Sequence, residues 1–218
     1  YILLKRHISL FFIFTCLFVV QMKTDAQTCS TSTYFKAATR SENSTRYNAW
    51  VTAAGESPDQ TITFENYTNG QTLNNINLGS LGASILNLEN SGSSGIVAHN
   101  DIGSAPPIGT RGARIDDNSN DGDDIRISFA TPVNYVGFYI IDLNGTSSTH
   151  QVRVNYSDGS LCNFSIDGVN ENCQCEEFLG IVAPTGKLIQ NIELYPNGGS
   201  QYGIDNLMYG TILINSCP

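Results

Sequence analysis

Alternation of apolar and polar residues continues through most of the chain after Pro58, and it constrains the fold more than any other feature. Successive side chains of a β-strand point to opposite faces of a sheet, so a run with a period of two predicts a strand with one buried face. The clearest runs cover residues 61–65, 125–129, 135–141 and 152–156, with further strand candidates at 188–195 and 203–214. The chain is therefore predicted to be rich in strands.

Turn signals separate these runs at short, regular intervals. They are Asn69-Gly70, Asn144-Gly145, Asp158-Gly159, Asp167-Gly168 and Asn197-Gly198-Gly199. Asn-Gly and Asp-Gly favour the tight turns of β-hairpins, and Asp158-Gly159 gives the best hairpin, between 151–156 and 160–166. Many short strands at this spacing predict an antiparallel β-sandwich.

One segment before Pro58 has helical periodicity. Tyr47, Trp50, Val51 and Ala54 fall on one face of a helix over 47–54, and Gly55 is a natural stop at its end. Trp50 is the chain's one tryptophan. On this apolar face it is expected to pack into the core, with stacking on a ligand as the alternative.

The first residues have the layout of a secretory signal peptide. A basic start, Lys5-Arg6-His7, precedes an apolar run over 8–20 and then a polar stretch that ends in Ala26. The apolar run is too short to span a bilayer. We expect a signal peptide at 1–26, a flexible leader at 27–45 and one β-sandwich domain at 46–218. The protein is expected to be secreted, with association with the cell surface as the alternative.

Charge and cysteines narrow the partners and the compartment. The formal net charge is −9, which argues against binding of nucleic acid and leaves cations and neutral polymers as partners. Five of the six cysteines follow residue 26, and an exported chain forms disulfides. Cys29 and Cys217 could tie the two ends together. Cys162 could pair with Cys173 or Cys175, which leaves one thiol over.

The sharpest local motif is the acidic run at 116–124. Asp117, Asp121 and Asp123 alternate with small polar residues around Gly122, and oxygen ligands at this spacing suit calcium. The closing Glu of an EF-hand is missing. The alternative is an acidic, solvated loop.

The chain resembles bacterial extracellular jelly-roll domains found in surface proteins of the PEP-CTERM type, which are similar in fold to carbohydrate-binding modules. The resemblance rests on Ile62-Thr63-Phe64-Glu65, on 129–133 leading into Val136-Gly137-Phe138, on Phe178-Leu179-Gly180, and on 202–207. It implies a jelly-roll β-sandwich with one short N-terminal helix. It also implies a structural calcium shared by Glu65 and Asp205. Asp142, at the end of a predicted strand, could be a third ligand. The alternative is that Glu65 and Asp205 accept backbone hydrogen bonds at strand ends.

These observations predict a secreted, non-enzymatic module that binds a polysaccharide or a matrix component and is stabilised by calcium. Tyr195 and Tyr202, near strand ends, could stack on a sugar ring. No zinc-protease motif, nucleophile elbow or phosphate loop occurs. Two alternatives remain: a self-assembling subunit of a surface layer or filament, and a secreted carbohydrate-active enzyme with paired carboxylates.

Overall fold

The computed structural model describes most of the chain downstream of the expected signal peptide. The described residues are 27–29, 34–88, 95–102, 108–115, 124–143, 149–167, 176–196 and 202–212. The predictions for residues 1–26, for Asp117, Asp121 and Asp123, and for Cys173 and Cys217 fall outside these ranges.

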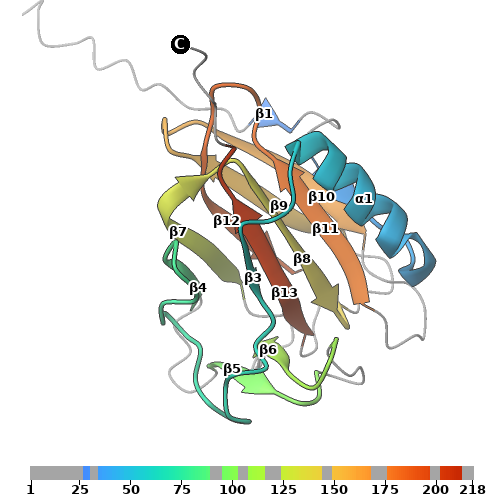
Figure 1. Cartoon of the computed structure of the whole chain (residues 1–218), viewed down its shortest axis with the longest axis vertical. Coiled ribbons are helices and arrows are strands. Elements are labelled where there is room, and N and C mark those ends of the chain that lie inside the picture. The colour runs from blue at the N-terminus through green and yellow to red at the C-terminus, as the bar shows by residue number, and fades with distance from the viewer. Residues whose placement is uncertain are drawn as a thin grey trace, which may run out of the picture.

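Two facing β-sheets form the body of the molecule (Figure 1). The strands of the first, sheet A, are in spatial order β1 (Gln27–Thr28), β10 (Leu161–Asp167), β9 (Thr149–Tyr156), β12 (Ile189–Tyr195), β7 (Ile125–Val133) and β4 (Ala83–Asn87). Sheet B has the order β2 (Tyr34–Lys36), β11 (Glu176–Val182), β8 (Tyr135–Ile141), β13 (Tyr202–Gly210), β6 (Gly112–Ile115) and β5 (Ile96–His99), with β3 (Gln60–Ile62) also pairing β13.

All of these strand pairs are antiparallel except β1 with β10. The predicted all-β, jelly-roll β-sandwich is confirmed, and so are the main alternating runs. The run at 135–141 is β8, and the predicted hairpin joins β9 to β10 through Gly159, whose φ is 82°. The inward side chains of both sheets form one core, in which Ile127, Val154 and Ile192 are fully buried. This core separates the outer face of sheet A from that of sheet B.

One predicted strand is shorter than its pattern. β3 ends at Ile62, although the alternation continues to Phe64 and Glu65. The φ of Phe64 is 61°, a left-handed conformation that takes the chain out of the sheet. Its side chain is nevertheless buried, at 1% exposure. The alternation of apolar and polar residues therefore extends past the end of β3, because Phe64 is buried although it does not belong to a strand.

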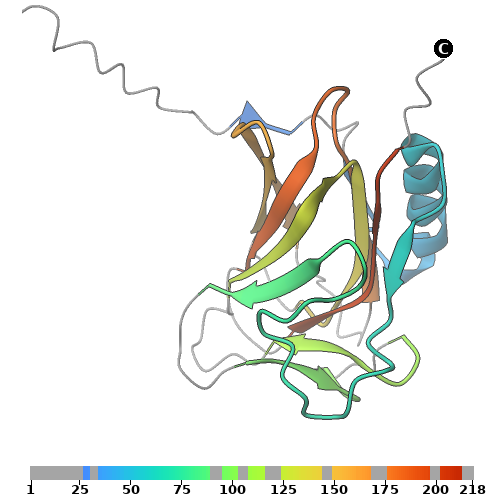
Figure 2. The same ribbon diagram turned by 60° about the vertical axis from the view of Figure 1, so that its left-hand side comes forward.

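A helix covers part of the outer face of sheet B. After a short 3-10 turn, η1 (Arg40–Glu42), helix α1 (Asn43–Ala54) lies across β11 and β2 (Figure 2). It ends at Gly55, whose φ of 79° and N–H bonds to the carbonyls of Val51 and Thr52 form the expected stop. Trp50 has no exposed surface, and its Nε1 donates to the carbonyl of Ile181 at 3.1 Å. The predicted core role of Trp50 is confirmed.

The described part of 27–45 is built into the sandwich, so the predicted flexible leader is wrong there. β2 pairs with β11, and β1 pairs with β10. This second pairing brings Cys29 to Cys162, and the two form a disulfide with a Cα–Cα distance of 4.9 Å. The predicted pairings of Cys29 with Cys217, and of Cys162 with Cys173 or Cys175, are therefore corrected. Sequence spacing does not show that the N-terminal strand adds to the edge at β10.

No helix within the described ranges is both long enough and apolar enough to cross a membrane.

Candidate functional site

The outer face of sheet A carries a ladder of polar side chains. On β9 and β12, Asn155 lies opposite Asn191, Arg153 opposite Glu193, and Gln151 opposite Tyr195. The residues between them belong to the core: Val152 and Val154 on β9, Ile192 and Leu194 on β12. Because side chains alternate across a strand, the polar set points away from the core. Helix α1 packs on sheet B, so among the described residues no helix covers this face (Figure 2).

The neighbouring strands widen the ladder into a platform, which we call the polar face. On β7, Arg126 pairs with Glu193 and Ser128 with Asn191. On β10, Ser165 lies opposite Gln151, and the Gln151 amide donates to its hydroxyl at 2.8 Å. The side chains of the polar face are those of Arg126, Ser128, Gln151, Arg153, Asn155, Ser165, Asn191, Glu193 and Tyr195.

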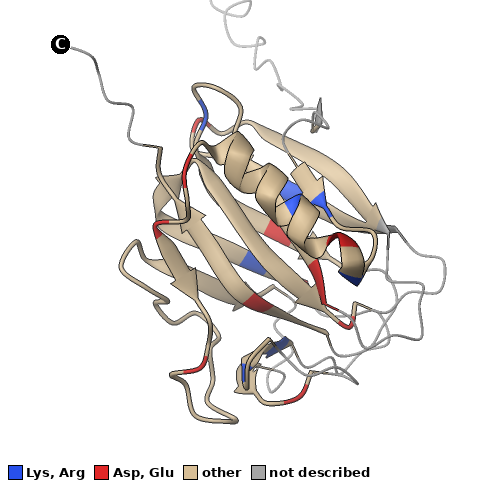
Figure 3. Cartoon of the chain, turned by 45° about the vertical axis from the view of Figure 1, so that its right-hand side comes forward, with Lys and Arg blue, Asp and Glu red and all other residues tan. Residues whose placement is uncertain are grey.

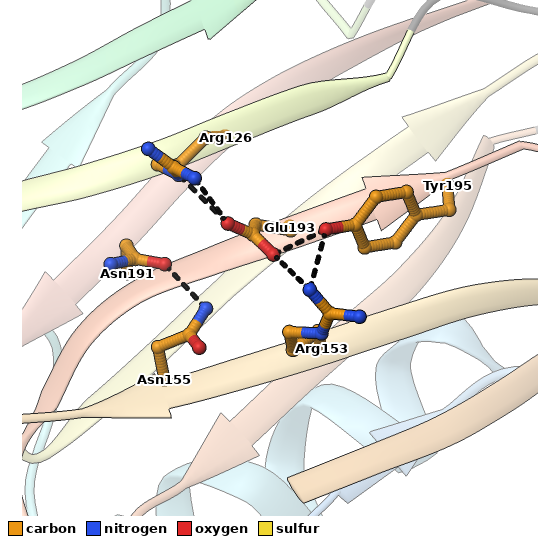
Figure 4. A network of polar contacts seen from close by, with 6 residues as sticks. All are labelled: Arg126, Arg153, Asn155, Asn191, Glu193 and Tyr195. Carbon is orange, nitrogen blue, oxygen red and sulfur yellow. Dashed lines mark hydrogen bonds and ion pairs between the residues drawn. The ribbon is translucent and has the colours of Figure 1, made fainter. Parts of the chain in front are cut away.

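Glu193 is the centre of this face (Figure 4). One carboxylate oxygen accepts from Nε and Nη2 of Arg126 at 2.8 and 2.6 Å. The other accepts from Nη1 of Arg153 at 3.3 Å and from the Tyr195 hydroxyl at 2.5 Å. The Asn155 amide separately donates to Asn191 at 2.7 Å. Both oxygens of Glu193 are thus engaged, and the three donors are held in fixed positions.

The network keeps Glu193 ionised. Desolvation raises the pKa of its carboxyl, but the hydrogen bonds from Tyr195 and Arg126 and the charges of the two arginines outweigh it, so the pKa is lowered. Burial, followed by the bond to Glu193, raises the pKa of Tyr195 to about 12. The Tyr195 hydroxyl therefore stays protonated and remains a donor. An ionised, fully engaged carboxylate positions its neighbours and does not supply a proton.

The two tyrosines predicted to stack on a sugar have different outcomes. Tyr195 lies on the polar face, where the Arg153 guanidinium is 5.1 Å from the centre of its ring. Tyr202 is 1% exposed and belongs to the core, because the first position of β13 points inward. Tyr202 cannot contact a ligand in this structure, and that prediction is wrong.

Sequence reasoning missed Glu193, Arg126 and Arg153. Each stands in an alternating run, which is enough to predict that it points outward. The three come from three different strands, 40 and 67 residues apart in sequence. Their meeting depends on the strand order β9-β12-β7, which no local pattern shows.

Glu65 and Asp205, the predicted calcium ligands, bind the same short segment. Oε1 of Glu65 accepts from the backbone N–H groups of Thr110 and Arg111 at 2.7 and 3.1 Å, and its other oxygen accepts from the Thr110 hydroxyl. Oδ2 of Asp205 accepts from the N–H of Ile108 at 2.8 Å. β3 pairs with β13, so Glu65, which follows β3, lies near Asp205 in β13. The structure thus shows the alternative role, as acceptors of backbone hydrogen bonds.

Among the residues that the structure describes, no three His, Cys, Asp or Glu side chains gather in a group that could hold a metal ion. Asp142, the predicted third ligand, follows β8 in a left-handed conformation with φ of 54° and is 4% exposed. Calcium at Glu65, Asp205 and Asp142 stays a prediction.

Charged residues of both signs lie around α1 (Figure 3), and three ion pairs join some of them. Arg40 lies 2.8 Å from Glu176, Lys36 lies 3.6 Å from Glu177, and Arg46 lies 3.5 Å from Glu42. Opposite charges at these distances cancel much of each other's field. In these three pairs, therefore, positive and negative charges lie side by side instead of forming a strip of one sign.

Comparison with known proteins gives a likeness in architecture. No family model matches the chain, and no curated protein sequence matches it. A chain of xylanase 10B of Clostridium thermocellum, with modules CBM22-1 and GH10 and complexed with xylohexaose, aligns at 16% identity with a TM-score of 0.45. The alignment covers 72% of this protein and 29% of that chain.

Two further structures align over most of their own length. The K2 cleaved adhesin domain of Lys-gingipain matches at 11% identity and a TM-score of 0.46, over 70% of this protein and 97% of that chain. The C-terminal family 22 carbohydrate-binding module of the same xylanase matches at 13% identity and a TM-score of 0.40, over 71% and 93%. The resemblance to PEP-CTERM-type domains stays a prediction.

Proposed function

We propose that this protein is a non-enzymatic, exported binding module that holds a glycan against the polar face of sheet A. The ladder of Asn155–Asn191, Arg153–Glu193 and Gln151–Tyr195 carries the proposal. Sugar hydroxyls both donate and accept hydrogen bonds, and amide, hydroxyl and guanidinium groups supply both roles. An open face several strands wide suits an extended polymer more than a small molecule.

Preorganisation supports binding at this face. Side chains that must be immobilised on binding cost about 0.5–1.5 kcal/mol each. Arg126, Arg153 and Tyr195 are already fixed by Glu193, and Asn155 by Asn191. Part of that entropic cost is therefore met on folding.

A glycan array, followed by affinity electrophoresis in the polysaccharides that score, tests the proposal. The double variant Gln151→Ala/Asn155→Ala removes two amides and leaves Glu193 and its partners in place. At about 0.5–1.5 kcal/mol for each lost hydrogen bond, retention should fall by about tenfold. Absence of any glycan ligand, or equal retention of variant and parent, would overturn the proposal. Release of reducing ends from the retained polysaccharide would also overturn its non-enzymatic part.

Calcium is a separate part of the proposal. It rests on the spacing of Asp117, Asp121 and Asp123, which would supply carboxylate oxygens to one ion. Ligand binding to the folded state raises the melting temperature. Removal of calcium with a chelator should lower it, and Asp121→Asn should abolish the difference. Equal melting with and without chelator contradicts this part alone.

A further inference from the structure

An open cleft lies on the opposite side of the molecule from the polar face. Its volume is about 400 Å³, and it opens beside the first turn of α1, over the outer face of sheet B. Small-molecule sites have volumes of roughly 300–1,000 Å³. The lining comes from four parts of the chain: the η1–α1 turn, the segment at Ile108, the end of β8 with the start of β11, and the middle of β13.

Two tyrosines form one wall, and their rings are fixed. Tyr47 on α1 and Tyr139 on β8 both meet the ring of Phe178 edge-on, with centroids 5.6 and 5.4 Å away. The pKa of Tyr139 is raised, first by desolvation and then by the nearby Tyr47 and Glu176. Its hydroxyl is therefore protonated at neutral pH. Neither tyrosine hydroxyl bonds to another group within the described ranges. Both hydroxyls are thus available to a ligand.

Asn206 enters the cleft because β13 is irregular. Ile204 points into the core, so regular alternation would also send residue 206 inward. The pairing of β13 with β8 shifts between Asp205 and Met208, and Asn206 has a φ of 47°. Such bulges re-aim a side chain and are frequent beside binding sites. The Asn206 amide lines the cleft, and among the described residues it bonds to no protein group.

Buried contacts hold this geometry. Asp205 lies directly opposite Tyr139 and is fully buried. Its carboxyl oxygens accept from the N–H of Asn206 at 2.6 Å and from that of Ile108 at 2.8 Å. On the helix side, the Asn43 amide donates to the carbonyl of Glu176 at 2.9 Å and accepts from the N–H of Phe178 at 2.8 Å. The walls are therefore set before any ligand arrives.

The charges of the lining cancel. Arg40 and Glu176 are its two formally charged residues, and they are paired at 2.8 Å. What remains is hydroxyl, amide and aromatic surface. Phenol hydroxyls and an amide match the hydroxyls of a sugar, and a tyrosine ring can pack on its C–H groups. An ion would have to compete with the Arg40–Glu176 pair.

We propose that this cleft is a second ligand site, which takes a small, uncharged, hydroxyl-rich molecule such as a mono- or disaccharide. Tyr47, Tyr139 and Asn206 supply its hydrogen bonds. The inference goes beyond the proposed function, because the cleft and the polar face share no residue. Either site can fail without the other.

A titration of the purified protein followed by ¹⁵N NMR tests the cleft. The probes are glucose, galactose, mannose and N-acetylglucosamine, with glucuronate as the charged counterpart. We expect the Asn206 side-chain amide to shift for at least one neutral sugar, with a Kd of about 1 mM, typical of a few hydrogen bonds. No shift at Asn206 with any neutral sugar, or a shift with glucuronate alone, would overturn the inference.

Matched variants assign the effect to the cleft. Asn206→Gly removes the amide and tolerates the left-handed backbone, while Tyr139→Phe removes a hydroxyl and keeps the ring against Phe178. Together they should weaken neutral-sugar binding by about tenfold or more, measured at the backbone amides of Tyr47 and Ile108 because the variant lacks the Asn206 side chain. Gln151→Ala/Asn155→Ala on the polar face should leave the titration unchanged. Loss of binding in that control, with binding kept in the cleft variants, would place the site on sheet A and contradict the proposal.

Discussion

Gly137 on β8 lies directly opposite Gly180 on β11, and the indole of Trp50 covers both. A Cβ at Gly180 would lie 2.5 Å from Cγ of Trp50, and one at Gly137 would lie 3.0 Å from its six-membered ring. The two glycines leave a flat recess in the outer face of sheet B. That recess lets α1 approach the sheet closely enough to bury Trp50 completely.

Gly180→Ala should therefore destabilise the protein. Adding a methyl group to a filled site costs about 1–3 kcal/mol, because neighbouring side chains or the backbone must move. Urea unfolding measures the change as a lower midpoint with an unchanged slope. Gly95→Ala is the matched control, since its Cβ would meet nothing closer than 3.7 Å. Equal loss in both variants would show that the cost does not come from the contact between residue 180 and Trp50.

Glu193→Gln should lower stability at neutral pH. The glutamine amide has one acceptor oxygen where the carboxylate has two. It can accept either from Arg126 or from Arg153 and Tyr195, so the donors on the other side lose their partner. The side chains of Arg126 and Arg153 are 38% and 40% exposed, so water offsets part of the loss. We expect a decrease of about 1–2 kcal/mol in the free energy of unfolding.

The pH dependence of the same variant gives a second check. The pKa of Glu193 is lowered on folding, so its contribution is present above the ordinary value of 4.5 and is lost as the pH falls through the folded value. The difference between parent and Glu193→Gln should shrink when unfolding is measured in acid instead of at neutral pH. If the difference in the free energy of unfolding between parent and variant is the same in acid and at neutral pH, the carboxylate charge is not the stabilising feature.

Local sequence patterns predicted the strands and the helix of this fold well, but they did not predict which strands lie next to one another in the sheets. Alternation located β8, and Gly55 correctly ended α1, because both signals act over a few residues. At Phe64, which has a left-handed backbone, the alternating pattern continues past the end of the strand because the side chain is buried. The Glu193 network depends on strand order and register, which tertiary packing decides. Tyr195 was predicted as a ligand contact only because it is an aromatic residue near a strand end.

The disulfide between Cys29 and Cys162 should stabilise the fold, and its connectivity can be checked directly. It joins residues 133 apart and fixes β1 to the edge of sheet A. Replacing both cysteines with serine should cost about 2–4 kcal/mol, chiefly because the unfolded chain gains freedom. Mass spectrometry of a non-reduced digest should recover the Cys29 and Cys162 peptides as one species. A Cys29 peptide linked to Cys217 instead would contradict the structure.

Asp205 should make the protein less stable as the pH rises. Desolvation raises the pKa of its carboxyl from the ordinary 3.8 to about 8, against the two backbone hydrogen bonds that lower it, with smaller contributions from Glu65 and Glu176. Between these values the folded state holds a proton that the unfolded state has released. Its contribution is therefore complete below pH 4 and is lost as the pH rises through about 8. The slope is at most about 1.4 kcal/mol per pH unit.

Asp205→Asn isolates this effect, because the amide is neutral at every pH and still accepts one of the two N–H bonds. The variant should lose stability in acid, where the protonated Asp205 fits its site. Its stability relative to the parent should improve steadily as unfolding is repeated at higher pH up to about pH 8. Since Asp205 holds the backbone of Ile108 and Asn206, the Asn206 amide resonance should follow the same titration in the parent. A stability difference that does not change with pH would mean that Asp205 is ionised in the folded protein, with its two backbone hydrogen bonds outweighing burial.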